Sequence, residues 1–175
     1  YSQYPNCFFE QAAIVPSHMM TYHDDSDTIP LYYRTDRPPH NSYEQANVLS
    51  SFRVGPKSAV ATSVDVPCLD LHSLLKKYNL IGVEFELLQT DLEGLDLPLL
   101  LDINFEKILP RYIRAETVST TTTAATNHLT QWGYEPLDVD PYYEIYKKDW
   151  HKDWPEAHFG GLEPAGYNTV WERKE

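Results

Sequence analysis

The sequence predicts an α/β domain whose sheet is mostly parallel and carries an antiparallel edge strand. Apolar, strand-like segments alternate along the chain with segments whose apolar residues recur at helical spacing. The last two strand-like segments are separated only by a turn at Asp140-Pro141, and so short a connection favours an antiparallel pair. A chain of 175 residues is long enough for one domain with a hydrophobic core.

The first third of the chain predicts one strand and a long insertion. Residues 7–15 are apolar and end at Pro16, which is typical of a buried strand that runs into a loop. Residues 17–57 are rich in aspartate and proline, with short strand-like runs only at 31–34 and 49–52. Long connections inside a compact domain are usually functional lids or disordered inserts, so we interpret this segment as a candidate substrate loop.

The middle of the chain alternates strands and helices. Residues 59–68 predict a strand, and residues 69–78 predict a short amphipathic helix with Asp70 at its amino-terminal cap. A further strand is expected over 82–90. Residues 95–103 then favour a short helix, in which Pro98 is tolerated because it falls in the first turn.

The last third predicts a strand at 112–116 and a helix over 117–132 that ends at Gly133. Residues 135–139 and 142–147 are the expected antiparallel pair. Residues 149–175 contain tryptophan, proline and glycine with little periodicity. We therefore expect a domain over 1–148, followed by an irregular tail that wraps the surface or meets a partner.

The most informative motif is LLQTDLEGLD, at residues 87–96. An apolar strand leads directly into Asp91 and Glu93, and Gly94 then frees the backbone to turn. In an open α/β sheet, acids at the carboxyl end of a strand lie at the crevice where ligands bind. Asp91 is a candidate general base, or a candidate group for orienting the acceptor hydroxyl. Glu93 is a candidate for completing a polar pocket or for binding a cation. The alternative is structural, because acids at such turns also cap backbone amides.

Segments in a fixed order resemble motifs of the FkbM family of S-adenosylmethionine-dependent methyltransferases. They are residues 6–14 (NCFFEQAAI), 66–75 (VPCLDLHSLL), 91–94 (DLEG), 105–114 (FEKILPRYIR) and 133–134 (GY). Glu116 stands where the family has the acid that ends its next strand. The resemblance implies a Rossmann-like class I methyltransferase sheet. It also implies transfer of a methyl group from S-adenosylmethionine to a hydroxyl of a sugar or natural product.

For individual residues, the resemblance implies catalytic roles for Asp91 and Glu93, with Asp91 beside the methyl donor. Gln11, Ala12 and Ala13 correspond to the place where the adenine ring lies, with Gln11 able to bond its amino group. Their alternative role is tight packing of a strand against a helix.

The chain contains no Gly-x-Gly sequence, so the glycine-rich turn that holds the cofactor in this family is missing. We therefore expect a partial domain that lacks the first βαβ segment. Its exposed sheet edge would be covered by the tail, by a missing amino-terminal segment, or by a second copy in a homo-oligomer. The alternative function is a catalytically incomplete fragment that acts as a binding module.

Composition excludes several other classes of function. The net charge is −12 and the pI about 4.9, which argues against a nucleic-acid partner. No apolar run approaches the roughly 18 residues of a membrane span, and no signal region is recognisable, so we expect a soluble cytoplasmic protein. Cys7, Cys68 and the scattered histidines lack the spacing of a disulfide framework or a metal site, and we predict no metal.

Overall fold

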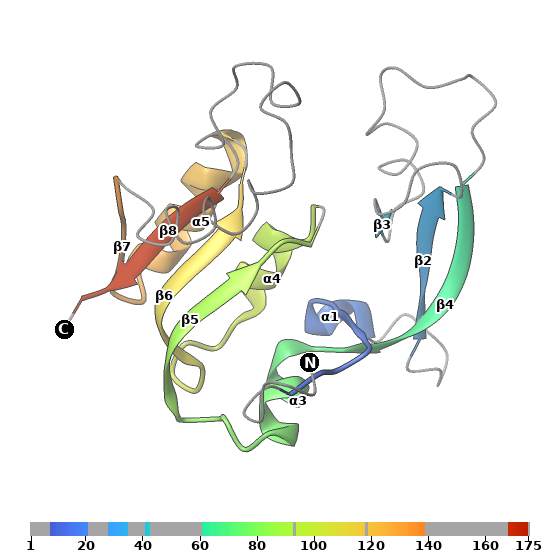
Figure 1. Cartoon of the computed structure of the whole chain (residues 1–175). Coiled ribbons are helices and arrows are strands. Elements are labelled where there is room, and N and C mark those ends of the chain that lie inside the picture. The colour runs from blue at the N-terminus through green and yellow to red at the C-terminus, as the bar shows by residue number, and fades with distance from the viewer. Residues whose placement is uncertain are drawn as a thin grey trace, which may run out of the picture. The chain divides into compact units, whose positions relative to one another are not determined.

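The computed structural model divides the chain into two compact units, Tyr1–Asn79 and Leu80–Glu175 (Figure 1). It describes residues 8–20, 28–34, 41–42, 61–92, 94–117, 119–138 and 168–174. Each unit combines helices with a four-stranded sheet, which confirms the α/β class. The boundary at Asn79 divides the residues that we expected to form one domain.

The first unit contains a mixed sheet in the order β1-β4-β2-β3. β1 pairs in parallel with β4, whereas β2 pairs antiparallel with both β4 and β3. Its elements are β1 (Ala13–Ile14), α1 (Ser17–Met20), β2 (Thr28–Arg34), β3 (Asn41–Ser42), β4 (Ala61–Leu69) and α3 (Leu71–Lys77).

The insertion expected at 17–57 contributes regular structure in its described part. β2 runs along β4 over its whole length, from the pair Thr28 and Pro67 to the pair Arg34 and Ala61. The strand predicted at 31–34 is therefore real but longer, because β4 supplies a partner that local sequence does not reveal. The run at 49–52 lies outside the described residues.

Helix α3 begins where the capping signal predicted. The Asp70 carboxylate accepts hydrogen bonds from the Ser73 backbone amide (2.8 Å) and from the Ser73 hydroxyl (2.6 Å). At the other end of the helix, Glu10 Oε2 accepts from Lys77 Nζ (2.6 Å) and from the Tyr78 hydroxyl (2.9 Å). These bonds lower the pKa of Glu10 and fasten the segment before β1 to the end of α3.

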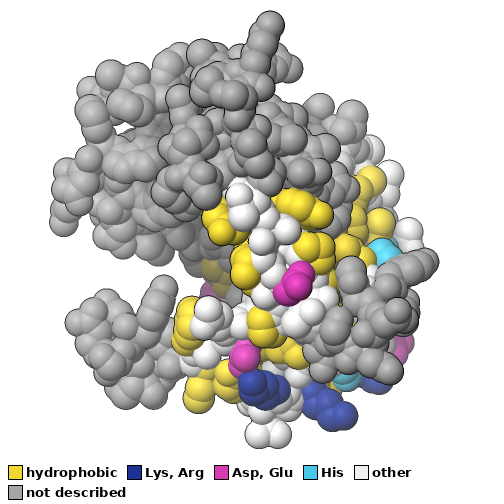
Figure 2. All heavy atoms as spheres, turned by 90° about the vertical axis from the view of Figure 1, so that its right-hand side faces the viewer, with side chains coloured by type: hydrophobic (Ala, Val, Ile, Leu, Met, Phe, Trp, Pro, Cys, Tyr) yellow, Lys and Arg dark blue, Asp and Glu magenta, His cyan; other side chains and the backbone are white. Residues whose placement is uncertain are grey.

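Some apolar side chains of this unit remain at the surface. Phe8, Phe9 and Val64 are 74%, 65% and 49% exposed. Figure 2 shows hydrophobic side chains interspersed with polar ones over one face of the described residues. The Phe8 ring lies tilted against the Tyr78 ring with centroids 5.1 Å apart, which extends the contact made by Glu10.

The second unit contains a sheet in the order β5-β6-β8-β7. β5 and β6 are parallel, and β8 is antiparallel to both of its neighbours. Among the described strands of this unit, β5, β6 and β7 therefore run in one direction and β8 runs in the other. The elements are β5 (Glu84–Thr90), α4 (Asp96–Asp102), β6 (Leu109–Glu116), α5 (Ser119–Thr130), β7 (Tyr134–Pro136) and β8 (Asn168–Arg173).

The end of the chain contributes a strand where an irregular tail was expected. β7 pairs antiparallel with β8, which lies within 149–175. The strand expected at 142–147 lies outside the described residues. Trp171 of β8 is fully buried, and its Nε1 donates to Thr126 Oγ1 of α5 at 3.0 Å. The apolar run of β8 is short and its partners are distant in sequence, so periodicity does not reveal it.

The sheets are mixed and not mostly parallel as predicted. Among the described strands, two neighbouring pairs are parallel, β1 with β4 and β5 with β6, and the other pairs are antiparallel. We expected the antiparallel strand at the edge of the sheet, but in the second unit β8 lies between β6 and β7. No helix within the described ranges is long and apolar enough to cross a lipid bilayer.

The core of the second unit lies between the sheet and its helices. α4 packs on α5, and α5 packs on β7 and β8. Leu99, Leu129, Ile113 and Trp171 are at most 1% exposed. Tyr134 is equally buried, and its hydroxyl donates to the Pro110 carbonyl at 2.6 Å. Burial raises the pKa of Tyr134 to about 12, so the hydroxyl keeps its proton and remains a donor at neutral pH.

We predict that Tyr134→Phe lowers the free energy of unfolding by about 1 kcal/mol, because it removes the donor of a buried hydrogen bond while keeping the ring. The measurement is urea denaturation followed by tryptophan fluorescence. Tyr112→Phe is the matched control, since its hydroxyl bonds Glu172 in a partly exposed position. Equal effects of the two substitutions would contradict the assignment.

Candidate functional site

Asp91 directly follows the last residue of β5. Thr90 is paired with Ala115 of the parallel strand β6, so Asp91 and Glu116 come next at the same edge of the sheet. Asp91 is exposed and Glu116 is half-buried. Gly94 has a φ of +106°, which favours glycine and confirms the predicted turn. Glu93 lies outside the described residues.

A second acid, Asp96, lies beneath this turn at the start of α4. Asp96 is 2% exposed, and its Oδ2 accepts a hydrogen bond from the Leu92 backbone amide at 2.9 Å. Thr90 is 7% exposed. Within the described part of the chain, Asp96 Oδ1 and Thr90 Oγ1 are buried and have no hydrogen-bond partner. The edge therefore contains two buried polar atoms with unused bonding capacity.

Several effects act on the pKa of the Asp96 carboxyl. Burial raises the pKa of Asp96, the Thr90 hydroxyl and the Leu92 amide act against that rise, and the negative charge of Asp91 adds to it. The Thr90 hydroxyl has the largest of the opposing effects, although Thr90 Oγ1 and Asp96 Oδ1 do not form a hydrogen bond of normal geometry. The arrangement suits a ligand that brings positive charge or hydrogen-bond donors to the turn.

Threonine hydroxyls extend the polar edge toward β8. Thr117 follows β6 and is 4% exposed. Its Oγ1 lies 2.8 Å from Thr169 Oγ1 of β8 and accepts from the Thr122 hydroxyl of α5, also at 2.8 Å. These contacts connect β6, α5 and β8 at the edge where Asp91 lies, and they fix the end of β6.

Gln11, Ala12 and Ala13 belong to the first unit. Gln11 is exposed, and Ala12 and Ala13 are half-buried. Gln11 and Ala12 precede β1, and Ala13 begins it by pairing with Cys68. Among the described residues of the apolar run at 7–15, only Ala13 and Ile14 form a strand. Asp91 belongs to the second unit.

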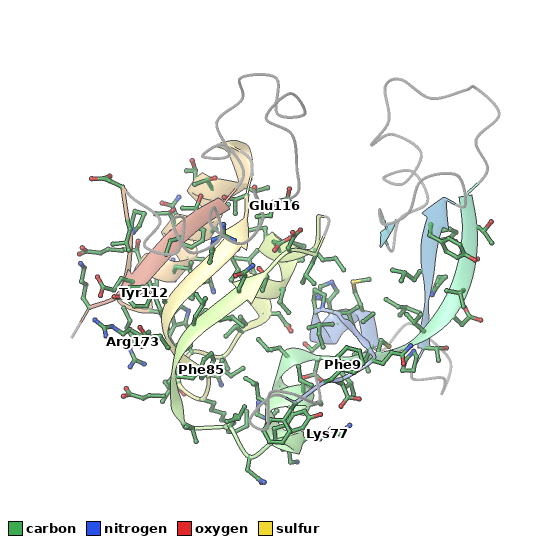
Figure 3. All side chains as sticks on the ribbon, viewed as in Figure 1. Phe9, Lys77, Phe85, Tyr112, Glu116 and Arg173 are labelled. Atoms are coloured by element: carbon green, nitrogen blue, oxygen red, sulfur yellow. The ribbon has the colours of Figure 1, made fainter. Side chains whose placement is uncertain are left out.

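A shallow hollow of about 650 Å³ lies elsewhere on the second unit, near the amino-terminal ends of β5 and β6. It is lined by Glu84, Phe85, Glu86, Arg111, Glu172, Arg173 and Lys174. Figure 3 shows Glu116 at one end of the sheet and Phe85 and Arg173 toward the other. Asp91 does not line this hollow.

The charges around the hollow are paired with one another. Arg111 lies 3.5 Å and Lys174 3.9 Å from Glu172, and Arg173 pairs with Glu84. These are surface pairs, each of which contributes little to stability. Acidic and basic side chains thus satisfy one another, and we assign the hollow no ligand. In the described part of the chain, no group of three or more His, Cys, Asp or Glu residues could hold a metal ion.

Compared with protein-family models, with curated proteins and with solved structures, the chain has no significant match. The FkbM resemblance therefore stays a prediction from the motifs, and a functional assignment depends on the edge residues themselves.

Sequence reasoning missed Asp96 and Thr90, although both belong to the motif at 87–96. An acid in the first turn of a predicted helix is a recognisable signal, since it interacts favourably with the helix amino terminus. The burial of Asp96 could not be predicted from the sequence pattern, because it depends on how α4 packs.

We predict that Asp96→Asn stabilises the protein at neutral pH. The raised pKa means that the folded state disfavours the charged carboxylate, so this cost is present at neutral pH and disappears as pH falls through the raised value toward the ordinary 3.8. Asparagine keeps an acceptor for the Leu92 amide without the charge. The measurement is the free energy of unfolding as a function of pH. Asp138→Asn, at an exposed aspartate, is the control, and a pH-independent gain would contradict the prediction.

Proposed function

We propose that the chain is part of an S-adenosylmethionine-dependent O-methyltransferase of FkbM type, with a Rossmann-like sheet. One observation carries this proposal: Asp91 of the DLEG motif stands at the carboxyl end of β5, beside the parallel strand β6. Ligands of open α/β sheets bind at that edge. The acceptor would be a hydroxyl group of a sugar or natural product, as the family resemblance implies.

Other placements of the motifs support the same proposal. The glycine of DLEG takes a left-handed conformation that permits a tight turn from β5 toward α4. Gly133 directly precedes β7, which begins at Tyr134 and pairs antiparallel with β8, and the family's GY likewise stands before its final strand pair. Glu116 ends β6, where an acid was expected.

The chemistry of the edge suits the proposed cofactor. S-adenosylmethionine carries positive charge on its sulfonium and its amino group, and Asp91 and Glu116 supply negative charge nearby. In the reaction, the acceptor oxygen forms a bond to the methyl carbon while the carbon–sulfur bond breaks and sulfur keeps the electron pair. The hydroxyl proton passes to a base, and exposed Asp91 is the candidate.

Cofactor binding by this chain is expected to be weak, because it has no Gly-x-Gly turn to hold the methionine and ribose parts. In this proposal the edge of β5 contributes to the sulfonium site. A test must therefore detect contacts at low affinity, and must report on individual residues.

We predict that titration of the ¹⁵N-labelled chain with S-adenosylhomocysteine, followed by NMR, shifts the backbone amide signals of Thr90, Asp91, Leu92 and Gly94. Asp91→Asn is expected to weaken this binding about tenfold, the size of one lost charged hydrogen bond. Asp138→Asn, at an exposed aspartate of the same unit, should leave the affinity unchanged.

The proposal would be contradicted if the ligand saturated a site that shifts only the amide signals of other residues. An unchanged affinity of the Asp91→Asn variant would also contradict it. No shift at millimolar ligand would also contradict it, and would favour the alternative of a binding module without cofactor chemistry.

A further inference from the structure

We propose that Asp96 is the positioning residue of the Asp91 turn. This inference rests on the proposed function, because it matters for catalysis only if Asp91 meets the cofactor or acceptor. Asp96 makes no contact with a reacting group in this proposal. It acts through the backbone, by holding the peptide group that joins Asp91 to Leu92.

The hydrogen bond itself defines this role. Asp96 Oδ2 accepts from the amide of Leu92 at 2.9 Å, and that amide belongs to the same peptide plane as the carbonyl of Asp91. Fixing this plane restricts the backbone rotation of Asp91 on its carboxyl side. The direction of the exposed Asp91 side chain is then set by a buried group and not by the turn alone.

The support is rigid because Asp96 is itself firmly held. It lies in the first turn of α4, where Leu99 and Leu100 are 1% and 0% exposed. The backbone bonds from Leu95 N to Leu92 O and from Leu99 N to Leu95 O continue the turn into the helix. A shift of α4 would therefore move the Asp91 peptide with it.

The positioning role requires a hydrogen-bond acceptor for the Leu92 amide and not a negative charge. A buried carboxylate is costly, and burial is the main cause of the raised pKa of Asp96. The Thr90 hydroxyl, one residue before Asp91, is also buried and acts on the same carboxyl. A neutral asparagine would accept a hydrogen bond from the Leu92 amide at lower cost.

The test compares Asp96→Ala with Asp96→Asn. We predict that Asp96→Ala accelerates hydrogen exchange of the Leu92 amide at least tenfold and shifts the Asp91 amide signal, because the acceptor is lost. It should weaken S-adenosylhomocysteine binding about tenfold. Asp96→Asn should restore both properties. Asp102→Ala, at the exposed carboxyl end of the same helix, is the control for general loosening of α4.

The outcomes separate this inference from the proposed function. Unchanged exchange at Leu92 in Asp96→Ala, or equal acceleration in Asp102→Ala, overturns the positioning role. Unchanged ligand affinity in a folded Asp96→Ala, while the native chain binds, also overturns it. If exchange responds as predicted but no variant and no native chain binds the ligand, the methyltransferase proposal fails and Asp96 still positions the turn.

Discussion

The second unit depends on β8, which lies between β6 and β7. Its hydrogen bonds join β7 to the rest of the sheet, and its Trp171 fills the space under α5. Thr169 of the same strand reaches Thr117 at the carboxyl end of β6. One strand thus joins β7 to β6, supplies the largest fully buried side chain among the described residues, and holds the edge that carries Asp91.

That edge combines an exposed acid with a buried one. Asp91 is open to solvent and available to a ligand, whereas Asp96 is enclosed and bonded to the backbone between them. The two carboxylates repel each other weakly, and the buried one bears the desolvation cost. This difference in environment is why we propose different tasks for two chemically identical groups, one at the ligand and one in the support of the turn.

Local signals predicted much of the fold, and distant contacts account for what they missed. Asp70 caps α3, Pro98 falls in the first turn of α4, and Gly94 turns the chain, because each of these effects acts within a few residues. β2 and β8 were underestimated because their partners lie far along the chain. In the site, Asp91 was visible as an acid after a strand. The burial of Asp96 was not visible, because it depends on how α4 packs in the folded unit.

The position of β8 also affects the order in which the second unit assembles. Thr117 and Thr169, which meet across the edge, are 52 residues apart in sequence. Closing so long a connection costs chain entropy before any pairing compensates for it, which makes such topologies slow to fold. On the ribosome, β5, β6 and the helices emerge well before β8 does. Until then the side of β6 that pairs with β8 and the face of α5 that packs on β8 stay uncovered. A nascent chain at this stage is open to capture by chaperones or to mispairing with other strands.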